Sequence, residues 1–392
     1  MYLPRHVEKE VGRWLKGDKI IIVRGPRQSG KTTLIKHIQE VYGGTYLDAQ
    51  LPKTKLMINS DSLLKLKQPI FIDEIGEIEN AGKFLKMMYD EHRIKFVVTG
   101  SGAFELRNPI GGSLVGRAIY ITLYPLSFSE FVMWKKPELY KYFSSYKQGL
   151  WDFIMRGKEI LPSNVEIGVE DMFLEYLKWG GYPSVVLGEE KEKIIANLVE
   201  TALEKDLFSY FDIRNKRKFL DILNLLSTRV GNLLNISSFN MHYNTVQKYL
   251  SLLENEFFIH LLPPFHKNLS TELRKAPKVF FIDNGIGNFI NPYGLSQGQL
   301  FENFVFSQLI HSVDKRKIRY WRTEHGAEVD FILLLKEIIP VEVKSTPKVS
   351  KSLRSFISQY KPKRAIILSS SNSIKLKEVD GCKVLMYPLW FI

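Results

Sequence analysis

Cysteine is nearly absent from this 392-residue chain, which contains only Cys382. No disulfide can therefore form within the chain, and a reducing compartment is its natural setting. The first residues hold no apolar signal core, and no apolar run approaches the length that spans a membrane. Internal repeats and low-complexity tracts are also missing. From these absences we expect a soluble, cytoplasmic protein that makes no membrane contact.

The apolar content is ample, with 45% hydrophobic and 12% aromatic residues, and the length suits two or three domains. The formal net charge of +13 is unevenly spread: residues 1–213 are nearly neutral, while residues 214–280 and 301–392 hold the basic excess. A polyanion, most simply DNA or another nucleic acid, would therefore meet residues 214–392. A basic balance that only aids solubility would give the same pattern, and so would a surface that docks an acidic protein.

One segment fits the nucleotide phosphate-binding loop G-x-x-x-x-G-K-[ST] at every fixed position; it consists of Gly25, Pro26, Arg27, Gln28, Ser29, Gly30, Lys31 and Thr32. An apolar strand at 20–23 leads in, and a helix that begins at Thr33 leads out. We expect the backbone N–H groups of the loop to surround the phosphates of ATP or ADP. Lys31 would reach the β- and γ-phosphates, and the Thr32 hydroxyl would ligate Mg²⁺.

A second motif supplies the acids that such a site needs. The apolar strand at 70–72 ends in Asp73 and Glu74, about forty residues downstream of the loop. We assign Asp73 to metal coordination and Glu74 to polarising the attacking water. Taken alone, an Asp-Glu pair after a strand could equally be a solvated strand end. Its pairing with the loop makes it the second half of an ATPase site.

Two further positions have both a catalytic and an ordinary interpretation. The strand at 96–98 ends in Thr99 and Ser101, either of which could sense the γ-phosphate, or the segment could be a plain strand-to-turn transition. Arg117 follows a glycine-rich segment at 111–116. It could stabilise transition-state charge, including that of ATP bound to a neighbouring subunit of a homo-oligomer, or it could be a surface arginine.

With these residues in view, the chain resembles the AAA-type branch of P-loop ATPases, and more narrowly a largely prokaryotic family that joins such a core to a DUF4143-like C-terminal domain. The matching segments are spread over most of the chain; they are 25–32, 71–74, 99–101, 114–117, 124–128, 180–183, 278–285 and 302–305. The resemblance implies an α/β fold: a P-loop NTPase core with a parallel sheet, a helical lid, and a C-terminal α/β domain of restriction-endonuclease-like fold. It also implies that Tyr182 and Pro183 contact the adenine base.

The predicted domains are an ATPase domain with its lid at 1–185, a winged-helix-like domain at 186–285 and the nuclease-like domain at 286–392. In the middle domain we expect a helix from 218, a short element near 236, and a second helix at 244–254 capped by Asn244 or Thr245. This order resembles a winged helix-turn-helix, whose second helix can enter a major groove. Such a domain can equally serve as a lever or a protein contact.

The C-terminal segment carries a possible second active site. Two apolar runs at 328–335 and 338–344 read as a hairpin that places Asp330 opposite Glu342 within one residue, with Lys344 on the same face as Glu342. Two carboxylates and a lysine can hold Mg²⁺ and activate water for phosphodiester cleavage. The set resembles a D…E-x-K nuclease site, with Glu302 as an extra acid that opens a helix, and with Gln359 and Tyr360 on the next helix.

Two function classes remain open at this point. In the first, ATP hydrolysis drives DNA binding or Mg²⁺-dependent cleavage by the C-terminal half. In the second, ATP sets an assembly state, and the nuclease-like domain is a catalytically silent platform that binds a partner.

Overall fold

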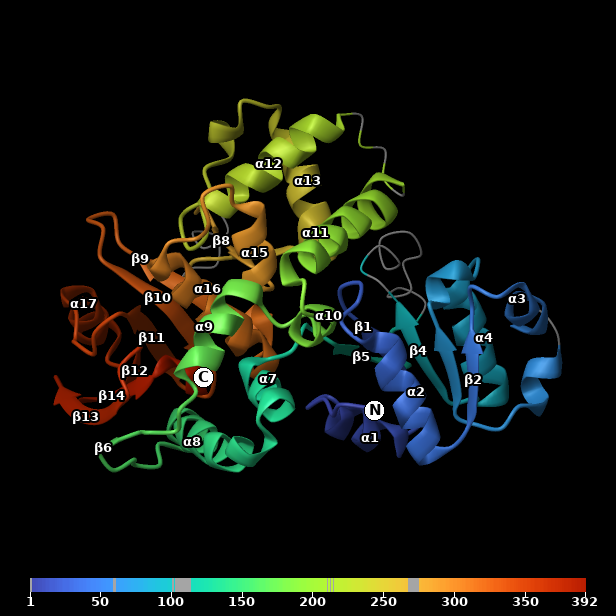
Figure 1. Ribbon diagram of the computed structural model, residues 1–392, viewed down its shortest axis with the longest axis horizontal. Coiled ribbons are helices and arrows are strands. Elements are labelled where there is room, and N and C mark those ends of the chain that lie inside the picture. Colours follow the sequence, from blue (N-terminus) through green and yellow to red (C-terminus); the bar gives the residue numbers. More distant parts are fainter. Residues whose placement is uncertain are drawn as a thin grey trace.

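The structure is a computed structural model that describes residues 2–58, 61–100, 102, 114–209, 211, 213, 215–266 and 275–392. Figure 1 shows a first part, on the right, built on a parallel sheet, and a larger second part that carries the remaining helices and a second sheet. Ser101 and residues 111–113, which belong to the predicted sensor and the predicted glycine-rich segment, lie outside the described residues. Within the described residues, no helix combines the length and apolar character needed to cross a membrane.

The first part holds a five-stranded sheet in the order β2-β3-β4-β1-β5, with every neighbouring pair parallel. This confirms the predicted parallel α/β core. Its strands are β1 (Ile20–Arg24), β2 (Thr45–Asp48), β3 (Ile70–Asp73), β4 (Phe96–Gly100) and β5 (Ala118–Thr122). Its helices are α1 (Glu8–Leu15), α2 (Lys31–Tyr42), α3 (Pro52–Ile58) and α4 (Ala81–His92), with short 3₁₀ turns at Asp61–Lys65 and Ile75–Glu77.

Strand alternation divides the apolar side chains of this sheet between two cores. Ile20 and Ile22 face a cluster that includes Leu85 of α4, whereas Ile21 and Val23 face a cluster that includes Leu34 of α2. Both faces are therefore covered, as a parallel sheet requires, and this explains why β1 is apolar at every position but its last.

The second part begins with a group of helices and a short strand. They are α7 (Phe128–Lys135), α8 (Pro137–Arg156), β6 (Ser163–Asn164), α9 (Glu170–Trp179), α10 (Pro183–Leu187) and α11 (Lys191–Thr201), followed by a π-helical segment at Ala202–Phe208. The buried side chains divide between Leu123, which packs with the first sheet, and Tyr124, which begins a core that extends to Ile392. The helices predicted as a lid thus share their core with the C-terminal part.

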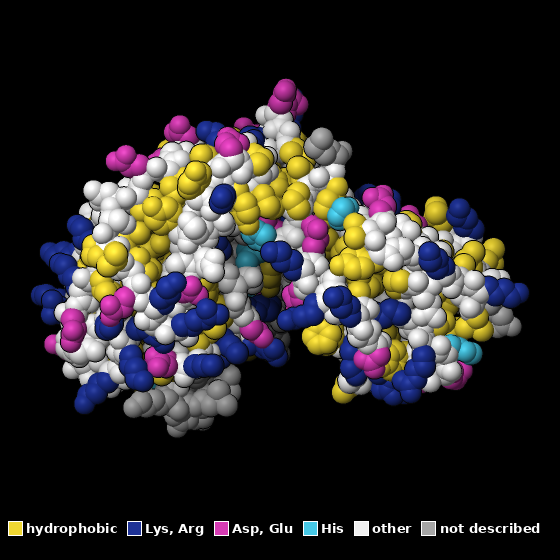
Figure 2. Space-filling view, turned by 90° about the horizontal axis from the view of Figure 1, so that it is seen from below, with side chains coloured by type: hydrophobic (Ala, Val, Ile, Leu, Met, Phe, Trp, Pro, Cys, Tyr) yellow, Lys and Arg dark blue, Asp and Glu magenta, His cyan; other side chains and the backbone are white. Residues whose placement is uncertain are grey.

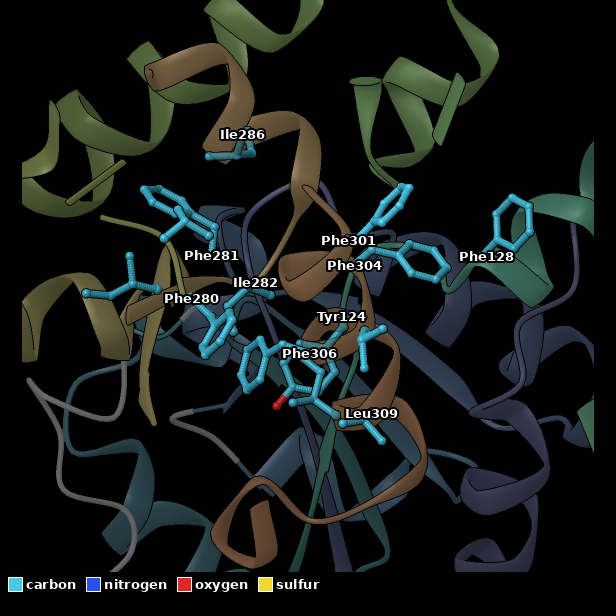
Figure 3. Packing of buried hydrophobic residues seen from close by; sticks show 14 of the residues in the cluster. Tyr124, Phe128, Phe280, Phe281, Ile282, Ile286, Phe301, Phe304, Phe306 and Leu309 are labelled. Carbon is cyan, nitrogen blue, oxygen red and sulfur yellow. The ribbon is translucent and has the colours of Figure 1, made fainter. Parts of the chain in front are cut away.

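Figure 3 shows part of this second core. Tyr124 and Phe128 enter it from the segment after β5, while Phe280, Phe304 and Phe306 enter it from residues far along the chain. The Phe128 ring lies edge-on to that of Phe304 with centroids 5.8 Å apart, and the Phe280 and Phe306 rings stack at 4.9 Å. Such aromatic pairs add to the burial energy and fix the relative position of the segments that carry them.

The middle segment follows the predicted order of elements. It contains α12 (Lys216–Thr228), a 3₁₀ turn (Ile236–Phe239), α13 (Tyr243–Asn255), the antiparallel pair β7 (Ile259–Leu262) and β8 (Lys278–Phe281), and α15 (Asn284–Ile290). Val246 and Leu250 of α13 face the core as expected. The predicted cap was wrong, because the N-cap residue is His242 and its side chain makes no capping hydrogen bond. A helix, turn, helix and strand pair agree with a winged-helix arrangement, which stays a prediction.

The C-terminal elements, with β6 added at one edge, form a seven-stranded sheet in the order β6-β13-β14-β12-β11-β10-β9, with apolar side chains of α16 and α17 packed on its two faces. They are α16 (Gln297–Ser312), a 3₁₀ turn (Lys315–Lys317), β9 (Ile318–Arg322), β10 (Glu328–Leu334), β11 (Ile338–Lys344), α17 (Lys351–Tyr360), β12 (Arg364–Ser369), β13 (Ser373–Val379), β14 (Cys382–Pro388) and a final 3₁₀ turn (Leu389–Phe391). The hairpin prediction is confirmed: Phe331 pairs with Val341, and the same register sets Asp330 opposite Glu342. Glu302 does not open its helix, because α16 begins at Gln297 behind a Ser296 capping box.

A buried ion pair joins the two parts. The Arg5 guanidinium donates through Nε to Glu130 Oε1 at 2.9 Å, and through its two other nitrogens to the carbonyl oxygens of Ser29 and Tyr124. Glu130 also receives the N–H groups of His6 and Ser127, the latter as part of the capping box of α7. Burial alone would raise the pKa of Glu130, but the charge of Arg5 and the hydrogen bond from its guanidinium outweigh burial and lower the pKa to about 2.

We predict that Glu130→Gln destabilises the protein near neutral pH. Lowering the carboxyl pKa from 4.5 to about 2 corresponds to about 3 kcal/mol of stability. Because the folded-state pKa lies below the unfolded one, this contribution is present above pH 4.5 and is lost as the pH falls towards 2. Thermal unfolding of wild type and variant over this acidic range and up to neutral pH should show a gap that closes on acidification. Glu138→Gln, at a first-turn glutamate of α8, is the control; an equal effect there, or a pH-independent gap, would contradict the prediction.

Candidate nucleotide site and C-terminal carboxylate cluster

The loop from 25 to 32 leaves the carboxyl end of β1 and enters α2, as its sequence predicts. Gly30 has φ +97°, in the region that favours glycine, and Gln28 at the exposed tip has φ +61°. A Cβ on Gly25 would lie 2.1 Å from the carbonyl oxygen of Leu123, so only glycine fits beside the end of β5. The loop therefore packs directly against the segment that follows β5.

Lys31 lies in the loop and is 5% exposed. Its ammonium donates to the carbonyl oxygens of Gly25 at 3.0 Å and Pro26 at 2.8 Å, so its head is held where loop-bound phosphates would lie. The buried hydroxyl of Ser29 has no hydrogen-bond partner among the described residues. A buried polar atom without a partner is costly, and a phosphate oxygen would satisfy it. These observations fit a phosphate group in the loop.

Asp73, Glu74 and Thr99 are brought together because β4 lies between β1 and β3 in the sheet. The Thr99 hydroxyl donates to Asp73 Oδ1 and accepts the N–H of Glu74 at 3.0 Å. The Tyr46 hydroxyl donates to the second oxygen of Asp73 at 3.0 Å. Two hydroxyl donors therefore fix the Asp73 carboxylate, and Thr99 also holds the backbone of Glu74 beside it. Tyr46 was not identified from the sequence, since a tyrosine on a neighbouring strand carries no motif.

The residues present fit a magnesium ion. Thr32, in the first turn of α2, and Asp73, at the end of β3, offer the oxygen ligands that Mg²⁺ prefers, with the remaining positions left to phosphate and water. Thr33 follows on the exposed side of the same turn. Among the described residues, no three His, Cys, Asp or Glu side chains gather closely enough to hold a metal on their own.

Pro183 and Tyr182, the expected base contacts, lie beside the loop. Pro183 Cγ is 3.9 Å from where a Cβ on Gly30 would be, and Tyr182 lines a small pocket together with Pro26 and Arg27. Phe257 lines the same pocket with φ +60°, a strained conformation for a bulky side chain that tends to persist at functional sites. Sequence reasoning missed it because nothing in the local pattern signals that backbone.

Asp283 fastens the segment of Tyr182 and Pro183 to the start of α15 in the middle segment. Its carboxylate accepts the N–H groups of Gly181 at 2.7 Å and Ile286 at 3.1 Å, and burial raises its pKa to about 6. A Cβ on Gly180 would lie 2.1 Å from this carboxylate, and one on Gly181 would lie 2.1 Å from the Leu126 carbonyl oxygen. The segments at 124–128, 180–183 and 278–285 therefore meet at one joint beside the nucleotide loop.

Arg117 lies away from the loop of its own chain. It precedes the amino end of β5, whereas the loop follows the carboxyl end of the parallel strand β1. Its guanidinium forms a two-point ion pair with Asp90 of α4 at 2.7 and 3.0 Å. This hydrogen-bonded pair lowers the pKa of Asp90. This geometry therefore does not support a contact between Arg117 and ATP bound to its own chain. A role for Arg117 across a subunit interface stays a prediction.

The predicted C-terminal residues do come together. Asp330 accepts the N–H of Val343 at 2.7 Å, and Glu342, which is fully buried, accepts the Ser350 hydroxyl at 2.6 Å and pairs with Lys344 at 3.4 Å. Burial raises the pKa of Asp330, of Glu342 and of Glu302, the last to about 8, with Asp330 adding to the effect on Glu302. Gln359 and Tyr360 lie at the end of α17, between β11 and β12 along the chain.

A second lysine enters this cluster from the middle segment. Lys278 of β8 is 1% exposed, forms an ion pair with Glu328 and lies 3.7 Å from Glu302 Oε2. Its pKa is raised, because burial, which would lower it, is outweighed by Glu302, Asp330 and Glu328. Lys278 and Lys344 thus balance much of the negative charge that a divalent cation would otherwise balance. Sequence reasoning missed Lys278, which lies far from the D…E-x-K pattern along the chain.

Three sequence families match successive parts of the chain. Residues 17–132 match the family described as AAA domain, residues 170–297 a domain of unknown function (DUF8612), and residues 297–390 a domain of unknown function (DUF4143). An uncharacterized protein of Haemophilus influenzae is 25% identical, covering 96% of this chain and 94% of its own length. An uncharacterized protein of Methanocaldococcus jannaschii is 23% identical over 89% of this chain and 82% of its own.

Solved structures resemble the chain more distantly. A Walker-type ATPase of Pyrococcus abyssi is 13% identical and aligns with 74% of this chain and 96% of its own with a TM-score of 0.44. The Orc1 protein of Aeropyrum pernix, solved in complex with DNA, is 11% identical, aligns with 79% and 95%, and has a TM-score of 0.26. At these scores the likeness bears on neither ligand nor partner. The family matches confirm the resemblance seen in the motifs: the chain joins a segment that matches an AAA domain, at 17–132, to a C-terminal segment that matches DUF4143, at 297–390.

Proposed function

We propose that this protein hydrolyses ATP and uses the nucleotide state to control nucleic-acid binding by its second part. The observation that carries the proposal is the joint beside the loop, where Arg5, Pro183 and Asp283 link the loop region to the second core. A change at the phosphates can therefore be transmitted through the hydrogen bond to Ser29 and through packing on Gly30.

In the reaction we propose, Lys31 neutralises charge on the β- and γ-phosphates, and Ser29 and the loop N–H groups hold their oxygens. Glu74, at the open end of β3, accepts the proton of the water that attacks the γ-phosphorus, and ADP leaves as the bond to its β-phosphate oxygen breaks. Thr99 holds Asp73 and the Glu74 backbone in register. Magnesium, held by Thr32 and Asp73, would supply positive charge that spreads over the phosphate oxygens.

A second candidate function is cleavage of nucleic acid at Asp330, Glu342 and Lys344. The observation in its favour is that Glu342 Oε2 is buried without a hydrogen-bond partner among the described residues. Against it, Lys278 and Lys344 already balance the carboxylates, and a metal ion would have to compete with a buried ammonium. We therefore favour the hypothesis that the C-terminal domain is a platform that binds a partner without cleaving nucleic acid.

The nucleotide assignment is tested by Lys31→Ala. Removing the loop lysine should abolish ATP hydrolysis without changing the fold, because the charge that it places on the β- and γ-phosphates disappears with it. Steady-state phosphate release, with circular dichroism to check folding, measures this, and Lys193→Ala on α11 is the control. Turnover at the wild-type level in Lys31→Ala would refute the phosphate-loop assignment.

Coupling to nucleic acid is tested in the same assay by adding single-stranded, duplex and branched DNA. We expect at least one of them to change the turnover of the wild-type protein, because the loop and the second core share the joint. Turnover unchanged by any nucleic acid, but coupled to a change of oligomeric state, would instead favour the assembly switch.

The positioning role of Thr99 is tested by Thr99→Val. The change keeps the shape but removes the hydrogen bonds to Asp73 and Glu74, and loss of such supporting partners typically costs about 10- to 100-fold in activity. We expect kcat to fall by about that much while ATP affinity stays nearly constant. Thr54→Val, at an equally buried threonine of α3, is the control. A fall in affinity with unchanged kcat would contradict a positioning role.

The proposal of a silent platform predicts that the purified protein leaves supercoiled plasmid intact in Mg²⁺ or Mn²⁺. Agarose gels over several hours measure nicking, with and without ATP. Nicking by wild type that disappears in the Asp330→Ala, Lys344→Ala double variant would overturn this expectation and establish a nuclease.

A further inference from the structure

A large cleft lies where the two parts face each other. Figure 2 shows the molecule hollowed between the ATPase part on the right and the rest on the left, with lysine, arginine and histidine side chains gathered at the hollow. The cleft measures about 990 Å³. Its walls come from the segment before α1, the ends of β1 and β5, the middle of α8 and the turn after α16; they include Arg5, Arg24, Tyr120, Lys147, His311 and Lys315.

The charge of this cleft is mainly positive. Its acids are Glu10, Glu130 and Asp314, and each lies beside an arginine: Glu130 pairs with Arg5, Asp314 with Arg316 at the rim, and Glu10 lies 3.9 Å from Arg13. Three more cations line the cleft from three separate elements: Arg24 from β1, Lys147 from α8 and Lys315 from the turn after α16. Burial lowers the pKa of Lys147 to about 8 and that of His311 to about 3, so His311 offers a neutral hydrogen-bonding ring at neutral pH.

An aromatic platform lies within the same cleft. The Arg24 guanidinium lies over the Tyr120 ring, 5.3 Å from its centroid, and donates to the Thr122 hydroxyl. Tyr120 keeps 36% of its surface exposed. Basic groups interleaved with an exposed aromatic ring are the combination that holds a single strand, through its phosphates and one stacked base.

The exposed ring favours a single strand over a duplex. Tyr120 can stack only on a base that is free of its neighbours, whereas the bases of a duplex are already stacked on one another.

We propose that the cleft between the two parts binds single-stranded nucleic acid, with Arg24 and Lys315 on its phosphates and Tyr120 stacked on a base. This deepens the proposed function and rests on it, because it locates the partner beside the ATPase and not on the helix-turn-helix surface. Arg5 connects the two sites, since its guanidinium forms part of the cleft wall and donates to Ser29 of the phosphate loop. A strand in the cleft therefore acts on the loop through one side chain.

The test measures binding of a fluorescein-labelled single-stranded DNA of about 15 nucleotides by anisotropy, a length within the span that one strand-binding module covers. Arg24→Gln combined with Lys315→Gln should weaken binding at least about tenfold. It should also make the slope of log K against log salt shallower by about 1.4, because each phosphate that is no longer neutralised accounts for about 0.7. The control pair, Lys193→Gln with Lys363→Gln, removes the same charge from two strongly exposed positions elsewhere and should leave affinity nearly unchanged.

A third pair, Lys218→Gln with Lys248→Gln, removes one cation from α12 and one from α13 that line a shared pocket. Weaker binding in this pair but not in the cleft pair, equally weak binding in the control pair, or no binding by wild type would overturn the proposal. Lys31→Ala should still bind the strand. We expect that variant to lack ATP hydrolysis, so its binding of DNA tests the cleft alone. If only the cleft pair loses binding, the cleft proposal stands even when DNA does not change ATP turnover. The proposal of the cleft and the proposal of nucleotide control can therefore fail separately.

Discussion

The guanidinium of Arg5 is the constraint on which the arrangement of the two parts depends. A charge with its exposure reduced to 7% is costly unless its donors find acceptors, and here the acceptors come from three places: the phosphate loop, the segment after β5 and the first turn of α7. Arg5 can be buried only if these three elements stay together. The division between the cores at Leu123 and Tyr124 falls beside this contact, so the ion pair acts as a clamp across the boundary between them.

Two buried amide side chains of α16, to which no chemical role is assigned, hold distant segments together. Asn303 is fully buried and exchanges hydrogen bonds with both backbone groups of Phe281, while Gln308 accepts the N–H of Phe128 and donates to Tyr176. Each bond ties α16 to a segment far from it in the chain. The AAA part and the DUF4143 part are therefore connected through satisfied backbone groups, which tolerate little sliding, and movement at the nucleotide is expected to shift α16 as a unit.

Local patterns predicted where the loop, the acids and the hairpin lie, and they missed what depends on distant contacts. The phosphate loop, the acids after β3 and the register of the β10–β11 hairpin follow from short-range rules of spacing and alternation, so the sequence was sufficient for them. Arg5 and Lys278 gain their meaning from partners far along the chain, and one sequence by itself shows no such pairing. The cap of α13 was mispredicted because Asn244 is a good capping residue, whereas the helix starts one residue earlier, at Tyr243, and helix boundaries are the least certain part of such a prediction.

A count of charges along the chain does not show which cations are accessible to a polyanion. The basic excess after residue 213 includes Lys278 and Lys344, which face buried carboxylates and offer little to a polyanion outside. Cations that line a shared hollow come instead from both parts: Arg24 from the nearly neutral ATPase half, and Lys315 from the turn after α16. A site assembled from two parts exists only while the Arg5 clamp holds them in place. The proposed nucleotide chemistry at the loop and the proposed strand binding in the cleft would act on the same joint, so the fold itself would couple them without a separate signalling element.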